Sequence, residues 1–201
     1  MEEKVRGEVA RAAECLLAGG VVLLPTDTVY GLAVHPERDQ AITRLFAMKG
    51  RPRSVNLPVM ISSPDDIPAL GGVVSKAAEL LLESKYVPGP LTLALGVSQP
   101  ELAPWLRGRD EFAVRIPDDQ RLLAILRTTG PLLVTSANLH AEQVRESVPD
   151  ILSTLASKPD LVIDDGNRDT VSSTLVNCRR LPPVIERVGA VPEEEIGAIL
   201  R

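Results

Sequence analysis

Two segments of the sequence combine hydroxyl, carboxylate and cationic side chains that could bind an anionic ligand. Residues 25–31 contain two threonines and an aspartate directly after an apolar run, and open α/β sheets bind ligands where such a run ends. Alternatively, these side chains hydrogen-bond the amides of a tight turn. Residues 49–53 contain three cations, among which Lys49 offers a point charge and Arg51 a planar fork for phosphate oxygens. Alternatively, these cations follow the C-terminus of a helix on an exposed turn.

Two later segments place polar side chains inside or at the end of apolar stretches. Arg115 interrupts the apolar residues 112–116, and a cation there needs a carboxylate, a backbone carbonyl or a ligand as its partner. An ion pair with an acid such as Asp27 or Asp164 explains Arg115 as well as a ligand does. Residues 135–138, Thr-Ser-Ala-Asn, could bind adenosine or phosphate oxygens, or could cap the segment that follows.

Several common catalytic and nucleotide-binding motifs are absent from the sequence. It contains no GxxxxGK[ST] loop, no GxGxxG, no HExxH and no GxSxG. The two histidines, His35 and His140, have no cysteine or histidine at a spacing that suits zinc. Ser136 and His140 lie four residues apart, which is a weak signal for a catalytic dyad. Any nucleotide must therefore be held by a less common arrangement of side chains.

The elements that must position these residues alternate between helices and short apolar strands. Helices are predicted over residues 5–17, 39–48, 73–84, 119–127, 149–157 and 193–200, with a further helix start at residues 63–66. Strands are predicted over residues 21–24, 57–61, 91–95, 112–116, 132–134, 161–163, 174–176 and 184–187. This alternation is typical of an α/β fold in which helices cover a sheet.

Composition narrows the classes of protein that fit. A chain of 201 residues without a linker-like stretch indicates one domain, residues 1–201. A net charge of -5 and 2% aromatic residues argue against a chain that coats nucleic acid through bulk charge and base stacking. The two cysteines form no disulfide framework. Since neither a signal peptide nor an apolar span of about 20 residues is present, we expect a soluble cytoplasmic protein without a membrane partner.

Six segments in a fixed order make the chain recognisable. They are PTDTVYGL (25–32), KGRP (49–52), GPLTLAL (89–95), VRIP (114–117), TSAN (135–138) and ERVGAV (186–191). With these segments the chain resembles the YrdC-like family of threonylcarbamoyl-AMP synthases over nearly its whole length. The resemblance implies a single YrdC-like domain, in which helices flank a twisted mixed sheet with a concave basic cleft. It also implies the form of the family that lacks an extra C-terminal domain.

The resemblance implies an enzyme that converts L-threonine, bicarbonate and ATP into threonylcarbamoyl-adenylate and pyrophosphate, with Mg²⁺ bridging the phosphates. The product would pass to a separate tRNA threonylcarbamoyl-transferase complex. Residues expected at the threonine site are Thr28, Arg115 and Ser173. Residues expected at the nucleotide are Lys49, Arg51, Ser136, Asn138 and Arg187, of which the first two are the expected catalytic pair. Such a reaction needs positioned cations rather than a protein nucleophile or a histidine base.

The chain departs from the family pattern at residues 53–57, at residues 139–144 and at Thr170, all in loops expected near ATP.

Two other functions compete with adenylate synthesis. One is a YrdC-like paralogue that binds structured RNA without making the adenylate, and the scarcity of aromatic residues weighs against it. The other is carbamoyl transfer from a different donor, as in larger enzymes that contain a YrdC-like domain.

Overall fold

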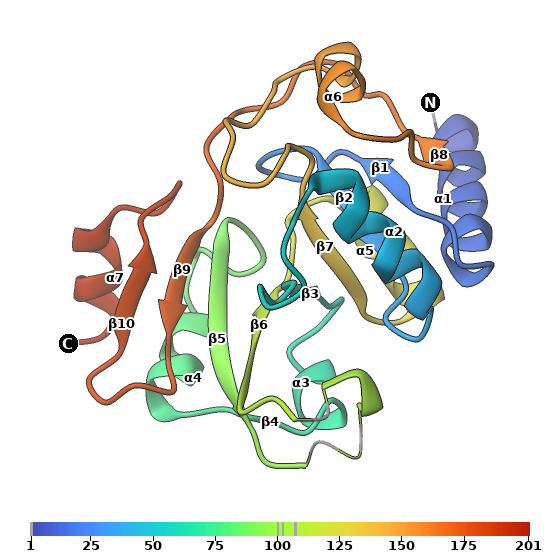
Figure 1. Ribbon diagram of the computed structural model, residues 1–201. Coiled ribbons are helices and arrows are strands. Elements are labelled where there is room, and N and C mark those ends of the chain that lie inside the picture. The colour runs from blue at the N-terminus through green and yellow to red at the C-terminus, as the bar shows by residue number, and fades with distance from the viewer. Residues whose placement is uncertain (1, 100, 102, 107) are drawn as a thin grey trace.

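The computed structural model describes residues 2–99, 101, 103–106 and 108–201. These residues form a ten-stranded mixed sheet flanked by helices, so the predicted α/β fold is confirmed (Figure 1). Met1, Pro100, Leu102 and Arg107 belong to the predicted domain and lie outside the described residues. The single domain over residues 1–201 stays a prediction.

The described strands are β1 Val22–Leu24, β2 Gly31–Val34, β3 Val59–Met60, β4 Gly72–Val73, β5 Leu91–Val97, β6 Glu111–Arg115, β7 Leu132–Ser136, β8 Leu161–Val162, β9 Thr174–Asn177 and β10 Val184–Arg187. The described α-helices are α1 Glu2–Leu17, α2 Asp39–Lys49, α3 Asp66–Ala69, α4 Lys76–Leu82, α5 Gln120–Thr129, α6 Val148–Thr154 and α7 Glu193–Ile199. A 3₁₀ turn, η1, covers Pro104–Leu106.

The strands follow the order β10-β9-β5-β6-β3-β7-β2-β1-β8, and β4 pairs with β5 outside this path. Three of the described pairs are parallel, namely β3 with β6, β5 with β9, and β1 with β8. The two-residue strand β3 joins β6 on one side to β7 on the other. The sheet therefore has two halves, and β3 is where they meet.

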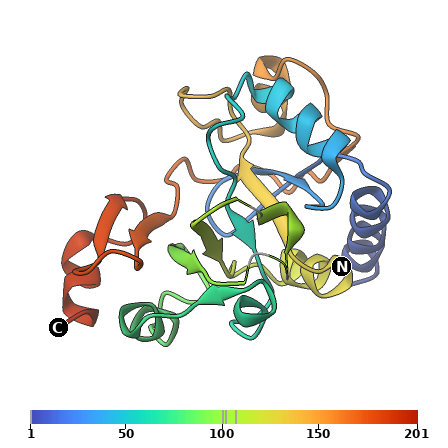
Figure 2. The same ribbon diagram turned by 60° about the horizontal axis from the view of Figure 1, so that its bottom comes forward.

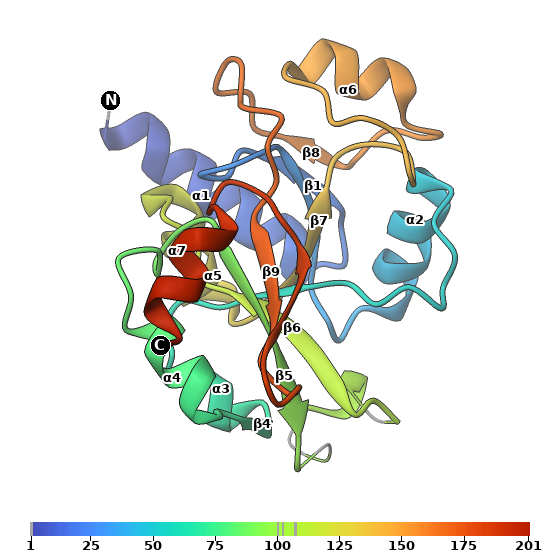
Figure 3. The ribbon, with the colours of Figure 1, turned by 90° about the vertical axis from the view of Figure 1, so that its left-hand side faces the viewer.

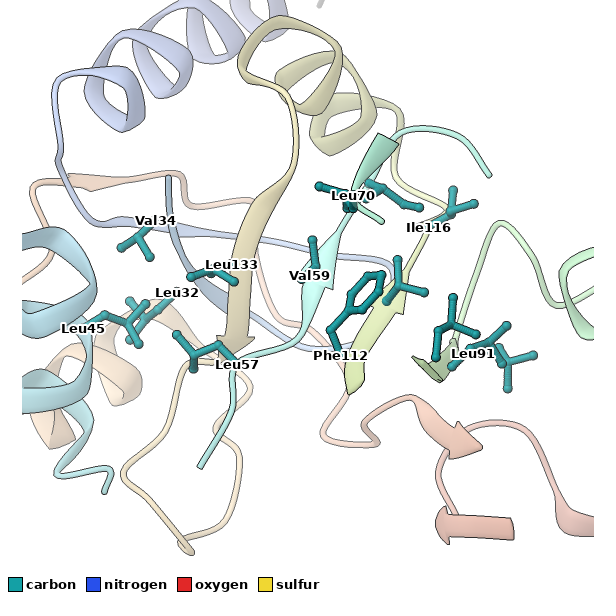
Figure 4. Packing of buried hydrophobic residues seen from close by; sticks show 14 of the residues in the cluster. Leu32, Val34, Leu45, Leu57, Val59, Leu70, Leu91, Phe112, Ile116 and Leu133 are labelled. Atoms are coloured by element: carbon teal, nitrogen blue, oxygen red, sulfur yellow. The ribbon is translucent and has the colours of Figure 1, made fainter. Parts of the chain in front are cut away.

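Strands β1 and β2 are buried on both faces because helices cover them from both sides. Leu32 of β2 packs in one apolar cluster with Leu45 of α2, and Figure 4 shows the two side by side. Val22 and Leu24 of β1 pack in a second cluster with α1 and α5. Figure 3 shows α2 and α1 on opposite sides of these strands. Such burial on both faces explains why residues 21–24 form a continuous apolar run.

Most predicted elements are present, although some are shorter or begin later: β3 covers only Val59–Met60, and α3 begins at Asp66 without a side-chain cap. Two further differences concern β2 and α4. Strand β2 was not predicted, because residues 25–31 have the composition of a loop and the chain turns back at once to pair β2 with β1. The helix predicted over residues 73–84 begins at Lys76, since the side chain of Ser75 accepts the N–H of Ala78 and caps it there. Residues before this cap form β4 instead.

The two ends of the described chain lie far apart. Figure 2 shows α1 beside α5 at one end of the molecule and α7 at the other. Across the described ranges, no helix is both long and apolar enough to cross a membrane.

Gly189, just after β10, brings the C-terminal part of the chain against the residues that precede β9. A Cβ atom at this position would lie 2.2 Å from the carbonyl oxygen of Ser172 and 2.6 Å from that of Ser173. The Gly189 N–H donates to the Thr174 hydroxyl at 2.9 Å, and this hydroxyl donates to the Val191 carbonyl at 2.6 Å. Only glycine permits this approach, because the neighbouring atoms are backbone and cannot rotate away.

We therefore expect Gly189→Ala to lower the free energy of unfolding by about 1–3 kcal/mol, the usual cost of overpacking. Gly197→Ala is the matched control, since Gly197 lies in α7 with no atom within 4 Å of an added Cβ. It should raise the free energy of unfolding by roughly 0.5–1 kcal/mol. Urea unfolding of both variants measures the difference, and a change of the same sign in both would contradict this account of Gly189.

Candidate functional site

An open pocket of about 370 Å³ lies across the two halves of the sheet. Residues of β2, β3, β5, β6, β7, β9 and β10 line it, together with loop residues that precede β2 and β3. Among the described residues, the charged side chains that line it are Arg51, Arg115, Arg187, Glu111 and Glu186. The pocket thus combines three guanidinium groups with two carboxylates.

The alternation of side chains along the strands decides which of them reach the pocket. On β5, Leu91, Leu93 and Leu95 are buried in the core, while Thr92 and Ala94 line the pocket. On β6, Val114 is buried in the core, while Glu111, Ala113 and Arg115 line the pocket. Phe112 packs in the apolar cluster (Figure 4) and also borders the pocket. Since successive residues of a strand point to opposite faces, one face of these strands is core and the other is pocket.

Arg115, at the end of β6, is held by two other parts of the chain, the loop after β1 and the turn before β5. Its Nη2 lies 2.7 Å from Asp27 Oδ1, and the two side chains are 5% and 10% exposed. Its Nε donates to the Gly89 carbonyl and its Nη1 to the Thr28 hydroxyl, each at 2.9 Å. The ion pair with Asp27 is therefore confirmed, and Asp164 contacts Tyr30 instead. Burial lowers the pKa of Arg115, and the charge of Asp27 opposes that shift.

The Arg115–Asp27 contact is a close ion pair without the alignment of a hydrogen bond. Arg115 Nη2 and both Asp27 oxygens are buried, and none of them has a hydrogen-bond partner among the described residues. The short distance and the missing hydrogen bond agree, because an ion pair requires only a short distance, whereas a hydrogen bond also requires a suitable angle at the hydrogen. Asp27 thus holds Arg115 Nη2 in place, and the Arg115 side chain contributes a charged group to the pocket lining.

The loop between β1 and β2 is held by its own hydroxyl groups and by Tyr30. The Thr26 hydroxyl donates to the Val29 carbonyl at 2.7 Å and accepts the Thr28 N–H at 3.1 Å. The Tyr30 hydroxyl donates to the Gly166 carbonyl at 2.7 Å, which ties the loop to the segment after β8. Residues 25–31 therefore form a hydrogen-bonded turn, and the same residues form part of the pocket wall.

Arg187 and Ser173 form a second hydrogen-bonded group in the pocket lining. Arg187 Nε donates to the Ser173 carbonyl at 3.0 Å and Nη2 to the Ser173 hydroxyl at 3.1 Å. The Ser173 hydroxyl also lies 2.7 Å from the Thr92 hydroxyl. Burial, with a smaller effect of the Arg115 charge, lowers the pKa of Arg187. Arg115 and Arg187 therefore lie close enough for their charges to repel each other, and both contribute positive charge to the pocket.

A β-bulge in β10 explains why two consecutive residues, Glu186 and Arg187, both line the pocket. Ile185 pairs with Val176, the next pair is Arg187 with Leu175, and Glu186 is the extra residue. An extra residue in one strand redirects the side chains around it. Glu186 accepts a hydrogen bond from Asn177 Nδ2 at 2.7 Å.

Six of the eight predicted site residues line the pocket, namely Thr28, Arg51, Arg115, Ser136, Ser173 and Arg187. Lys49 and Asn138 do not line it. The Lys49 side chain is 1% exposed, and its ammonium donates to the backbone carbonyls of Ser136 and Asn138. Asn138 Nδ2 donates to the carbonyls of Leu139 and Glu142 at 2.8 and 2.7 Å. Both side chains therefore support the loop after β7 from behind.

Arg51 reaches the pocket because α2 stops just before it. Gly50 adopts the left-handed conformation, with φ at 56°, and its N–H bonds to the last turn of the helix. Arg51 Nη2 then donates to the Asn56 carbonyl at 2.9 Å and holds the loop that leads to β3. Burial lowers the pKa of Arg51.

Thr92, Glu111 and Glu186 line the pocket and were not predicted as site residues. Thr92 had a signal, since it is the polar residue in an alternation of leucines. Glu186 belongs to the ERVGAV segment, but nothing in the strand pattern indicated that it faces the pocket, because a bulge changes which face a residue points to.

Asp27 should be essential for stability, because its removal leaves the Arg115 cation buried without a carboxylate. We expect Asp27→Ala to lower the free energy of unfolding by about 3–5 kcal/mol. Glu79→Ala removes the acid of the exposed pair with Lys76 and should change it by less than about 1 kcal/mol. Equal effects of the two substitutions in urea unfolding would show that the buried pair carries no special weight.

Lys49 should make stability depend on pH. Burial, with a smaller effect of Arg51, lowers the pKa of Lys49 to about 7, so the unfolded chain binds one more proton than the folded chain between that pH and the ordinary value of 10.5. Stability of the wild type should therefore rise with pH in this window relative to Lys49→Met, by up to about 1.4 kcal/mol per pH unit.

Urea unfolding at pH 7, 8 and 9 measures this slope. Lys76→Met is the control and should give no relative slope there, since Lys76 is exposed and Glu79 raises its pKa above the window. Parallel curves for the wild type and Lys49→Met would contradict the lowered pKa of Lys49.

Comparison with known proteins identifies the relatives of this chain. The family Sua5_yciO_yrdC, described as "Telomere recombination", matches residues 14–189. Threonylcarbamoyl-AMP synthases from Pyrococcus abyssi and Bacillus subtilis are 32% identical over 191 residues and 31% identical over 196 residues. These matches cover 94% and 96% of this chain and 56% of each relative, so the chain spans about half the length of these relatives.

A solved structure shares the fold. The crystal structure of P. abyssi Sua5 complexed with L-threonine matches with a TM-score of 0.84 and 32% identity, over 95% of this chain and 56% of that one. The family match, the identity of the relatives and the shared fold agree, and the chain belongs to the Sua5/YciO/YrdC family.

Proposed function

We propose that this chain synthesises threonylcarbamoyl-adenylate from L-threonine, bicarbonate and ATP, and releases pyrophosphate. The observation that carries the proposal is the convergence of Arg51, Arg115 and Arg187 with hydroxyl groups in one pocket. The relatives named threonylcarbamoyl-AMP synthase and the Sua5 structure complexed with L-threonine support this choice of substrates.

The chemistry requires positioned charge more than it requires a protein nucleophile. The threonine amine forms a bond to the carbon of bicarbonate, and water leaves to give a carbamate. A carbamate oxygen then forms a bond to the α-phosphorus of ATP, while the bond to the bridging oxygen breaks and pyrophosphate takes the electron pair. Both reactants are anions, so cations that hold them together and neutralise the leaving group lower the barrier.

The pocket offers groups for both reactants, and the hydrogen bond from Arg187 to Ser173 joins the two sets. Thr28, Arg115 and Ser173 would bind threonine, with the Arg115 guanidinium as the cation for its carboxylate. Arg51, Ser136 and Arg187 would bind the nucleotide, as expected from the sequence.

The two predicted nucleotide residues outside the pocket lining, Lys49 and Asn138, would act by positioning the Ser136 loop. Lys49 adds positive charge behind that loop when it is protonated. Arg51 is then the member of the expected catalytic pair that directly touches the phosphates.

ATP would enter with Mg²⁺, which bridges its phosphates and neutralises their charge. The described residues contain no group of three or more His, Cys, Asp or Glu that could hold a metal ion. We place the reaction in the cytoplasm, upstream of a separate tRNA threonylcarbamoyl-transferase complex.

Arg51→Ala should reduce pyrophosphate release at least about 100-fold, because one charged donor to the transition state is lost. The assay uses purified protein with ATP, labelled bicarbonate and threonine, and follows the adenylate and pyrophosphate. Arg53→Ala is the matched control, since Arg53 is exposed and bonds to Thr43 instead of lining the pocket. It should retain near-normal activity.

Near-normal turnover by Arg51→Ala would refute the role of Arg51. Absence of threonine-dependent product in the wild type, with salt-sensitive RNA binding in the same preparation, would refute adenylate synthesis and favour an RNA-binding module.

A further inference from the structure

Two buried hydroxyl groups meet in the pocket and are held by different strands. Thr92 is the second residue of β5 and Ser173 directly precedes β9, and the two side-chain oxygens lie 2.7 Å apart. Their exposures are 3% and 5%, yet both side chains line the pocket. Strand β5 pairs in parallel with β9, and Thr92 is opposite Leu175. Ser173 is two residues before Leu175 and therefore points to the same face of the sheet as Thr92.

A count of protons shows that this hydroxyl pair has one to give. Each hydroxyl carries one hydrogen and two lone pairs. One hydrogen is used between Thr92 and Ser173, and Arg187 Nη2 donates a further one to Ser173 at 3.1 Å. Within the described part of the chain, neither hydroxyl oxygen makes another hydrogen bond. Whichever hydroxyl donates inside the pair, one hydrogen remains for an acceptor in the pocket.

The direction of the chain of hydrogen bonds assigns that hydrogen to Thr92. The guanidinium of Arg187 polarises the Ser173 hydroxyl and makes its O–H the better donor. Hydrogen bonds that run in one direction strengthen each other. The favoured sequence is therefore Arg187 to Ser173, Ser173 to Thr92, and Thr92 to the ligand.

The ligand group at Thr92 should be neutral. A carboxylate gains more from a charged donor than from a neutral hydroxyl, and Arg115 lines the same pocket as Thr92 with a guanidinium group. The carboxylate of an amino acid would therefore go to Arg115. A hydroxyl oxygen on the same amino acid then remains as the acceptor for Thr92.

We propose that Thr92 is a specificity-determining residue that donates a hydrogen bond to the side-chain hydroxyl of the amino acid substrate. This inference rests on the proposed function, because it deepens the account of the same site. A site that donates to a substrate hydroxyl discriminates strongly against an analogue that lacks it. Valine is the matched analogue, since it has the shape of threonine with a methyl group in place of the hydroxyl.

The experiment compares threonine with valine as substrates of the wild type and of Thr92→Val, through binding by calorimetry and kcat/KM for pyrophosphate release. Thr92→Val should reduce the preference for threonine about 10-fold or more through weaker binding of threonine, with little change for valine. Thr92→Ser keeps the donor and should keep the preference. Thr129→Val removes an equally buried hydroxyl, which bonds to Ile125 in α5, and should also leave the preference unchanged.

The outcomes separate this inference from the proposed function. A wild type that neither binds nor uses threonine overturns both. A wild type that prefers threonine, with the same preference in Thr92→Val, overturns only the role of Thr92. Equal losses for threonine and valine in Thr92→Val also overturn it, because they would assign the hydroxyl to the carboxylate or to structure. Loss confined to threonine, with rescue by Thr92→Ser, supports it.

Discussion

The burial of the Arg115 guanidinium is the constraint on which the pocket depends. A cation inside a sheet must be surrounded by oxygens, and no single segment near β6 supplies enough of them. Asp27 and Thr28 come from the loop after β1, and the Gly89 carbonyl comes from the turn before β5. These segments converge on one side chain from opposite halves of the sheet. The loop is thus fixed in place by the same group that gives the pocket part of its positive charge.

The distribution of charge explains how an acidic protein can bind anions. The formal net charge of -5 belongs to the whole chain, whereas three of the five charged side chains that line the pocket are arginines. Burial lowers the proton affinity of Arg115, and partial desolvation of the guanidinium lowers that of Arg187, although Arg187 as a whole is exposed. A bound anion would offset that loss. An acidic exterior around a small cationic pocket suits a nucleotide better than a long nucleic acid.

Much of this arrangement could be predicted from the sequence, and the rest depends on contacts that have no sequence pattern. Apolar periodicity located most helices and strands, and the cation at Arg115 within an apolar stretch indicated a carboxylate as one of its possible partners. Strand β2 was missed because its first residue, Gly31, and the loop before it look like a turn. Lys49 shows that the spacing of residues alone does not predict which side chain reaches the pocket. Its spacing from Arg51 suggests two cations side by side, but the helix ends between them at Gly50, so that one lines the pocket and the other lies behind a loop.

The bulge in β10 has an effect beyond the direction of Glu186 and Arg187. Strand β10 is the last strand in the order of the sheet, and Val184 at its start and Val188 just after its end are exposed. A regular strand with such side chains is a template on which another chain could add its own strand and begin to aggregate. The extra residue twists this edge, while two consecutive prolines precede the strand and two charged residues lie in it. The irregularity that shapes one wall of the pocket thus also protects the protein against self-association through its free edge.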